Sequence, residues 1–310
     1  MKRLPAIALL WLAALPLFGQ GLRGTVRSTD SEPLSFATIY IKQLETGVST
    51  NADGRYEIKL SPGTYDLIFQ YLGYQTQQRT VTIGNDFQTL DMVLAQTVFR
   101  LKEAEVSAKA EDPAYTIMRK AIAKSKFHAL QLDGYSCRVY TKGSSRVIKV
   151  PFFLRKTMKK EGIDSSTVFL VESISDITYT RPNTYDEKVI SIRRVGDQDS
   201  IFPVGYIHGS FYRPKVAGAI SPLSPRAFGY YRFRLEGSYF DRDYEINKIR
   251  VIPRSRGDNV FSGHIYIIED LWSIHSLDLK TYTQGIPLKV RQIYAPIQET
   301  VWLPVTHDYE

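Results

Sequence analysis

The chain has 310 residues, 43% of them hydrophobic, and its 40 Lys and Arg against 32 Asp and Glu give a formal net charge of +8. This length suffices for about two domains. A single cysteine excludes an intrachain disulfide, and the basic residues are too dispersed to indicate a nucleic-acid site. Two local basic clusters, Arg155 to Lys160 and Arg250 to Arg256, are predicted to be solvated faces or to contact anionic lipid.

Residues 1–19 have the pattern of a secretion signal. A basic start, Met1 to Arg3, precedes an apolar run from Leu4 to Phe18, and Gly19 is a small residue suited to cleavage. The run is interrupted by two prolines and is shorter than the roughly 20 apolar residues that a membrane-spanning helix needs. We therefore predict export from the cytoplasm, the alternative being a retained N-terminal anchor. Lipid attachment is excluded because no cysteine lies near the cut.

Residues 21–95 are predicted to form a small antiparallel β-sandwich. The alternation of apolar and polar residues from Tyr65 to Tyr71 is typical of a half-buried strand. Turn-forming residues at Asn51 to Gly54 and at Ser61 to Gly63 flank another strand. The expected strands, spaced as in a sandwich, are Leu22–Arg27, Ser35–Lys42, Val48–Asn51, Arg55–Leu60, Thr64–Tyr71, Gln75–Ile83 and Thr89–Leu94.

Several motifs in this stretch belong together. They are G-x-V-x-S at Gly24 to Ser28, the strand Pro33 to Ile39, the turn segment Gly47 to Tyr56, and the stretch Gly63 to Tyr74. Together they resemble the carboxypeptidase-regulatory-like domain, a transthyretin-like sandwich. The resemblance implies a fold but no activity, because this module occurs beside metallopeptidases and also at the front of TonB-dependent outer-membrane receptors. Leu101–Val106 resembles the segment that follows the module in outer-membrane proteins.

Residues 96–111 are a polar connector, after which Asp112 and Pro113 predict the start of a helix, with an N-cap acceptor before a proline. One face of this helix is apolar. Packing of that face on a sheet is favoured over contact with a membrane surface. The apolar residues are Ala114, Ile117, Met118, Ala121 and Ile122.

From Tyr135 onward the chain is rich in strand patterns, so residues 112–310 are predicted to form an α+β domain with one amphipathic helix and a large curved antiparallel sheet. Turns are expected at Arg181 to Asn183, Gly196-Asp197, Asp241 to Asp243 and Gly285 to Pro287. The main expected strands are Tyr230–Leu235, Asn247–Ile252, Phe261–Ile268, Trp272–Tyr282, Leu288–Tyr294 and Thr300–His307.

Longer motifs connect this region to a family. They include Asp112 to Tyr115, Val171 to Pro182, Ser221 to Leu223, Tyr230 to Gly237, Ile249 to Arg254, Phe261 to Ile267 and Trp272 to Leu279. They resemble a Bacteroidota family of outer-membrane proteins of unknown function, in which the sandwich precedes a periplasmic domain and a C-terminal β-barrel. Because the sequence ends at Glu310, we expect either a truncated chain or a form without the barrel. The strand run that ends in Ile265-Tyr266 and the strand Trp272 to Leu279 also resemble the half-barrel of periplasmic lipoprotein carriers.

Metallopeptidase chemistry requires a His-x-x-Glu pair and a distant further ligand. His307 and Glu310 have the first spacing, but they end the sequence, so we expect no zinc site there. The other histidines show neither companion spacing nor a carboxylate paired with them: His128, His208, His264 and His275. The last two are expected on strands, facing solvent or bonded to a backbone acceptor.

Other catalytic patterns are also missing from the sequence, which has neither a Gly-x-Ser-x-Gly elbow nor a phosphate-binding loop. Cys137 falls in a predicted strand and is expected to be a buried, inert thiol. The pairs Asp197/Asp199 and Asp241/Asp243 lie beside turns and are expected to be solvated carboxylates rather than weak calcium ligands. We therefore predict no catalytic, cofactor-binding or metal-binding residues and no cofactor.

Aromatic residues offer one more hypothesis, because exposed rings can stack on sugars. Packing in the core and across strands is the favoured prediction. The residues concerned are Tyr179, Tyr185, Tyr206, Phe211, Tyr212, Tyr230, Tyr231 and Tyr239.

The leading functional prediction is a non-enzymatic binding or assembly module of the cell envelope, exported to the periplasm and associated with the outer membrane. The alternatives are a carbohydrate- or peptidoglycan-binding module, and an accessory domain of a metallocarboxypeptidase whose catalytic part is absent. The expected partner is an outer-membrane or periplasmic protein. Contact with anionic lipid or a glycan stays open, and nucleic acid is not expected.

Overall fold

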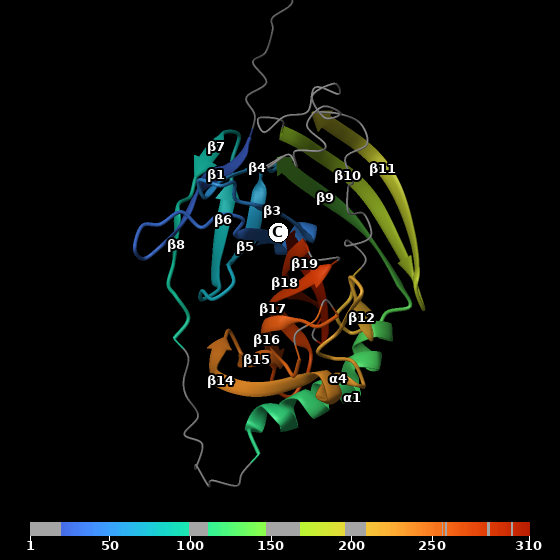
Figure 1. Cartoon of the computed structure of the whole chain (residues 1–310). Coiled ribbons are helices and arrows are strands. Elements are labelled where there is room, and N and C mark those ends of the chain that lie inside the picture. The colour runs from blue at the N-terminus through green and yellow to red at the C-terminus, as the bar shows by residue number, and fades with distance from the viewer. Residues whose placement is uncertain are drawn as a thin grey trace, which may run out of the picture. The chain divides into compact units, whose positions relative to one another are not determined.

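The computed structural model describes residues 20–98, 111–146, 168–195, 209–255, 257, 259–283, 286–298 and 300–310 (Figure 1). The predicted signal at 1–19, most of the predicted connector and the basic cluster Arg155 to Lys160 lie outside these residues. The chain divides into two compact units after Thr97. Within the described part, no helix has the length and apolar character needed to cross a membrane.

The first unit is a β-sandwich. Its elements are β1 (Gly21–Ser28), β2 (Thr38–Ile41), η1 (Lys42–Leu44), β3 (Thr46–Ser49), β4 (Arg55–Lys59), β5 (Gly63–Gln70), β6 (Gln77–Ile83), β7 (Phe87–Thr89) and β8 (Met92–Leu94). One sheet has the order β3-β2-β5-β6, and the other has the order β4-β1-β7 with β8 also on β1. The predicted sandwich is confirmed. Its pairs are antiparallel except those of β1 with β7 and β8, which are parallel.

The expected strand Thr89–Leu94 is interrupted. The side chain of Asp91 accepts a hydrogen bond from the backbone N–H of Thr25 at 2.7 Å, and the N–H of Leu90 donates to the carbonyl of Arg23 at 2.8 Å. A side-chain oxygen thus replaces a backbone acceptor of the ladder. The segment therefore forms β7 and β8 instead of one continuous strand.

The expected strand Ser35–Lys42 is also shorter in the structure, where β2 begins at Thr38. Phe36 has a positive φ of 63°, and the N–H of Ala37 donates to Thr50 Oγ1 at 2.9 Å. These two features hold the first residues in a turn, because a left-handed backbone conformation is incompatible with an extended strand.

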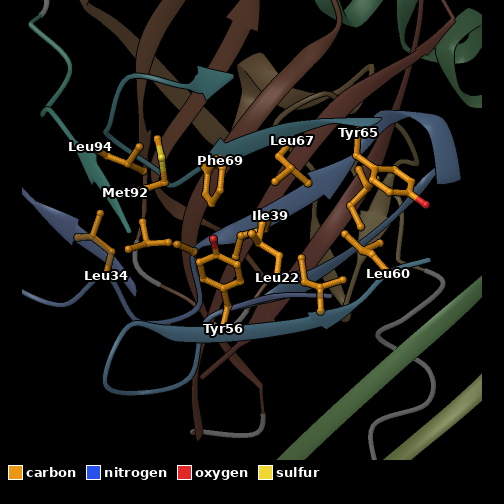
Figure 2. Close-up of a cluster of buried hydrophobic side chains, with 14 of the residues drawn as sticks. Leu22, Leu34, Ile39, Tyr56, Leu60, Tyr65, Leu67, Phe69, Met92 and Leu94 are labelled. Carbon is orange, nitrogen blue, oxygen red and sulfur yellow. The ribbon is translucent and has the colours of Figure 1, made fainter. Parts of the chain in front are cut away.

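The core of the sandwich lies between its two sheets (Figure 2). Ile39, Leu67 and Phe69 have no exposed surface. Tyr56 meets Phe69 edge-on at 5.8 Å between ring centroids, and its hydroxyl donates to the carbonyl of Leu90 at 2.7 Å. Each large apolar side chain buried in this way contributes about 1.5–3 kcal/mol. The unit is therefore held by apolar packing, as a chain without disulfides requires.

The second unit begins with the predicted helix, α1 (Pro113–Leu130). Asp112 caps it, because its Oδ1 accepts from the N–H of Ala114 at 2.9 Å. Tyr115 stacks on Phe228 at 5.7 Å and meets Phe233 edge-on at 6.1 Å. The helix lies along β14 (Tyr231–Asp241), as Figure 1 shows. The prediction that its apolar face packs on a sheet is confirmed.

The strands of this unit form a six-stranded sheet of order β14-β15-β16-β17-β18-β19, a three-stranded sheet of order β11-β10-β9 and a short ribbon, β12-β13. The six-stranded sheet confirms the predicted large antiparallel sheet, and the three-stranded sheet is an additional one that the sequence did not predict. The remaining elements are β9 (Gly134–Arg146), β10 (Val168–Thr180), β11 (Thr184–Val195), β12 (Lys215–Val216), β13 (Ala219–Ile220), α4 (Ala227–Tyr230), β15 (Tyr244–Pro253), β16 (Ser262–Ile268), β17 (Ile274–Thr283), β18 (Ile286–Gln298) and β19 (Val301–Tyr309). Tyr230, predicted to begin a strand, instead ends α4.

The six-stranded sheet is strongly curved. In a flat sheet, strands four positions apart are separated by about 19 Å. The rings of Tyr244 on β15 and Trp302 on β19 nevertheless have centroids only 5.2 Å apart. Asp241 on β14 and His275 on β17 are three strands apart and are joined at 3.0 Å. The sheet therefore curls at this end, which confirms the predicted curvature.

Asp112 connects α1 to this sheet, since its Oδ1 also accepts from the N–H of Leu235 on β14 at 3.1 Å. We expect Asp112→Ala to lower the free energy of unfolding by about 1–3 kcal/mol, because one substitution removes a helix cap and an acceptor for a strand amide. Urea unfolding followed by the fluorescence of Trp272 and Trp302 measures this. Asp133→Ala is the control: its exposed pair with Arg181 is worth less than about 1 kcal/mol. Equal losses in the two variants would contradict the prediction.

Candidate functional site

One face of the six-stranded sheet carries a row of charged side chains. In an antiparallel sheet, each residue lies directly opposite one residue on each adjacent strand. Residues connected in this way form a row across the sheet, and their side chains project from the same face. Phe233 and Val251, one position away from the row, are buried on the opposite face, where Phe233 contacts α1. We call the row's side the charged face. Its row consists of Arg234, Arg250, His264, Asp278, Arg291 and Asp308.

Glu236 is the centre of the main ion-pair cluster on the charged face. It is the extra residue of a bulge in β14, where the pairing with β15 shifts by one. Its carboxylate lies 3.3 Å from Lys248 Nζ, 3.5 Å from Arg250 Nη1 and 3.0 Å from His264 Nε2. The next residue, Gly237, has a φ of 132°, a backbone conformation that favours glycine.

This cluster has a defined charge state. Burial raises the pKa of Glu236, but His264, Lys248 and Arg250 outweigh that effect, so the pKa lies below its ordinary value. Burial lowers the pKa of His264 more strongly than Glu236 raises it. At neutral pH, Glu236 is therefore ionised, and His264 is neutral and donates its Nε2–H to the carboxylate.

Next to this cluster the charged face has an excess of cations. Arg234 lies directly opposite Arg250, and Arg232 follows on the same face of β14. Within the described part of the chain, no carboxylate lies in ion-pair range of Arg232 or Arg234, and Arg250 has only its long contact with Glu236. Like charges directly across a strand pair are destabilising unless something neutralises them. We call Arg232, Arg234 and Arg250 the arginine patch.

The other end of the same sheet holds a buried acid-base pair. His275 Nε2 lies 3.0 Å from Asp241 Oδ2, and His275 Nδ1 lies 3.1 Å from Ser276 Oγ. The order Ser-His-Asp is the order of a hydrolase triad, but Ser276 is only 2% exposed and Asp241 only 5%. A nucleophile must reach its substrate. The arrangement is therefore a satisfied buried network, not a catalytic one.

Aromatic rings surround this pair. Tyr239 meets His275 edge-on at 6.2 Å and Tyr266 at 6.5 Å, and Trp302 lies 5.8 Å from His275. Burial raises the pKa of Tyr239 and of Tyr266, so both phenols stay protonated at neutral pH. These rings exclude water from the Asp241–His275 pair.

The structure corrects several sequence predictions here. His264 and His275 both have a carboxylate partner, and His275 is buried instead of facing solvent. Asp241, expected to be a solvated turn residue, is buried, whereas Asp243 is exposed as predicted. No local sequence signal could find these pairs, because each joins residues on different strands.

The remaining candidates have structural roles. His128 is buried with its Nε2 3.1 Å from the carbonyl of Leu271, and His307 Nδ1 contacts Gln292 Nε2 at 3.0 Å. Cys137 is exposed, which contradicts the expected burial, and desolvation raises its pKa, so the thiol is not activated. In the described ranges, no three His, Cys, Asp or Glu side chains could together hold a metal ion.

Most of the aromatic residues considered for sugar stacking are buried, in agreement with the packing prediction. The five buried rings are those of Tyr179, Phe211, Tyr212, Tyr231 and Tyr239. Tyr185 and Tyr230 are half-buried. Tyr206, His208 and the pair Asp197/Asp199 lie outside the described residues.

We expect Glu236→Gln to destabilise the second unit by about 1–2 kcal/mol at neutral pH, because it removes the charge that three neighbours share. The pKa of Glu236 is depressed in the folded state, so its contribution is present above the ordinary value of 4.5 and is lost as the pH falls through the folded value. Unfolding curves of Glu236→Gln and of the unchanged protein should therefore converge as the pH falls below 4.5 and through the folded-state pKa of Glu236. For Asp243→Asn, an exposed control, we expect no such pH-dependent difference from the unchanged protein. A difference between Glu236→Gln and the unchanged protein that does not depend on pH would refute the assignment.

The buried pair gives a second stability prediction. Asp241→Ala should cost about 2–4 kcal/mol, because the carboxylate is removed and a buried imidazole nitrogen loses its partner. The matched control is Asp243→Ala, two residues away and exposed, with an expected change below about 0.5 kcal/mol. Both are measured by urea unfolding. Similar values for the two variants would mean that the contact with His275 does not stabilise the fold.

Comparison with known proteins gives matches to both units. Residues 22–106 match the CarboxypepD_reg-like domain, and residues 117–310 match the Family of unknown function (DUF5686). Over 91 residues the chain is 31% identical to the TonB-dependent receptor P39 of Formosa agariphila, a match that covers 27% of this chain and 9% of the receptor. The chain thus spans only a small part of that receptor's length.

Among solved structures, a protein of unknown function from Bacteroides fragilis NCTC 9343 aligns over 94% of this chain and 99% of its own length. It is 9% identical with a TM-score of 0.19, a value at which the alignment carries no argument about fold or function. The match over residues 117–310 covers well over half of the chain. The chain therefore belongs to the Family of unknown function (DUF5686) and carries a CarboxypepD_reg-like domain at its front.

Proposed function

We propose that this protein is a non-enzymatic, exported module of the cell envelope that binds an envelope protein at the outer membrane through its charged face. Three features support the placement: the secretion-signal pattern at residues 1–19, the CarboxypepD_reg-like domain and the similarity to a TonB-dependent receptor. Neither matched family implies a reaction. The observation that carries the binding role is the arginine patch.

The chemistry of the described side chains supports binding over catalysis. The acid-base groups that could transfer protons are engaged with one another: Glu236 with His264, and Asp241 with His275. The arginine patch, by contrast, presents guanidinium groups that can form paired hydrogen bonds with carboxylates. An acidic segment of a partner would relieve the repulsion between Arg234 and Arg250.

A protein partner fits the charged face better than a lipid surface does. Acidic side chains alternate with the basic ones: Glu236, Asp278 and Asp308 lie on the same face. A uniformly anionic membrane would attract the arginine patch but repel these carboxylates, whereas a protein surface can match both signs. The partner is therefore expected to be an acidic, mixed-charge surface of an envelope protein.

The test measures cosedimentation of the purified chain with outer-membrane fragments from cells that express it. We expect binding that protease treatment of the fragments abolishes, and only weak binding to protein-free vesicles of the extracted lipids. Arg232→Ser/Arg234→Ser/Arg250→Ser should weaken binding at least about tenfold, and added salt should weaken it further. Lys42→Ser/Arg55→Ser/Lys59→Ser removes the same charge from the first unit and should leave binding unchanged. Equal binding to the lipid vesicles, or no binding to the fragments, would overturn the proposal.

A further inference from the structure

The three-stranded sheet has an open edge. In the described part of the chain, β10 pairs with both of its neighbours and β11 pairs only with β10 (Figure 1). Val189, Ile190 and Ile192 on β11 are 47–52% exposed. A long edge strand that has unpaired N–H and C=O groups and exposes apolar side chains is a template for another strand, and soluble proteins seldom leave such an edge uncovered.

The charges along β11 make this edge complementary to itself. Asp186 and Glu187 lie near its start, and Arg193 and Arg194 near its end. None of the four has an ion-pair partner in the described ranges. Glu172, which lies opposite Arg193 on β10, is already paired with Lys142 at 3.3 Å. If a second β11 ran antiparallel beside the first, the acidic start of each strand would therefore lie next to the basic end of the other.

A bulge limits how two copies can pair. Ser175 lies opposite Val189 and Ile174 opposite Ser191, so Ile190 is an extra residue in β11. Before the bulge the odd-numbered residues share a face with Tyr185, and after it the even-numbered residues do. Two residues can lie opposite each other only when their side chains share a face. An antiparallel pair that spans the bulge must therefore match an even-numbered residue with an odd-numbered one.

We propose that β11 pairs antiparallel with β11 of a second copy of this chain, with Asp186 opposite the partner's Arg193 and Tyr185 opposite the partner's Arg194. The two-fold axis passes between Val189 and Ile190. In this register each opposite-charge pair occurs twice, and no like charges face each other. A shift by one residue at each strand would place Glu187 opposite Arg194 but also Lys188 opposite Arg193. The repulsion of the second pair offsets the attraction of the first, so this register is disfavoured relative to the proposed one, which has no like-charge pair.

The dimer would join two three-stranded sheets into one continuous six-stranded sheet across the axis. A single strand pair buries less surface than the roughly 1,200–2,000 Å² of a stable interface, so the dimer should be weak, with a Kd on the order of micromolar. Salt should weaken it, because its register depends on exposed charge pairs. This inference does not depend on the arginine patch or on an envelope partner.

Analytical ultracentrifugation of the purified full chain, from about 1 µM to about 500 µM, tests the proposal. Asp186→Arg and Arg193→Asp should each raise the dimer Kd at least about tenfold, because each places like charges opposite one another. The double variant Asp186→Arg/Arg193→Asp should restore the original Kd. A chain that stays monomeric throughout, or a double variant no better than the single ones, would overturn the proposal.

Three further variants fix the register. Lys188→Ser should leave the Kd unchanged, since Lys188 faces the partner's Ser191, whereas it would tighten the dimer in the shifted register. Asp186→Cys/Arg193→Cys, made with Cys137→Ser, should form a disulfide-linked dimer on oxidation, because opposed residues bring their Cα atoms within disulfide range. Lys188→Cys/Arg193→Cys in the same background should not. Unchanged far-UV circular dichroism of each variant excludes misfolding as the cause of a changed Kd or a missing crosslink. Crosslinking of Lys188→Cys/Arg193→Cys instead of Asp186→Cys/Arg193→Cys would contradict the register.

Discussion

Antiparallel pairing of six consecutive strands determines which side chains of the second unit can meet. Along each of these strands the residues alternate between two faces, so a single register separates the apolar positions beneath α1 from the charged ones on the other side. Burial of Phe233 and Val251 holds that register. A slip of one residue would bury Arg234 and Arg250 in the apolar layer. The free energy of desolvating these two charges exceeds what any exposed ion pair contributes.

The bulges in this sheet change what the register would otherwise produce. From the turn after Asp241, an unbroken hairpin would place Arg234 opposite Val251. The extra residue Glu236 shifts the pairing, so Arg234 lies opposite Arg250 and the carboxylate of Glu236 turns toward the charged face. A second bulge lies in β17, where His275 is the extra residue. Ile274 and Ser276 on either side of it pair with consecutive residues of β16. Glu236, the centre of the ion-pair cluster, and His275, the base of the buried acid-base pair, are therefore both at irregular positions in the sheet.

Some of this arrangement could be predicted from local patterns. The N-cap of α1, the hairpin around Asp241 to Asp243 and the antiparallel order of the last strands follow from capping residues, turn formers and alternation. Gly237 carried a weak signal for the first bulge, since glycine inside a strand pattern often marks one. Nothing in the pattern distinguished Asp241 from Asp243. They have the same side chain beside the same turn, and only the curl of the sheet brings one of them to His275.

The sequence by itself determined most of the local states of this protein: which segments extend, where most of them turn, where the helix begins, and that each unit must be held without disulfides. These depend on interactions within a few residues of each position. The tertiary structure alone decided the partners of the charged side chains. The contact between Asp241 and His275 spans 34 residues of sequence and three strands of the sheet. Its existence depends on accumulated twist and on bulges along several strands, and no single segment of the chain encodes those quantities.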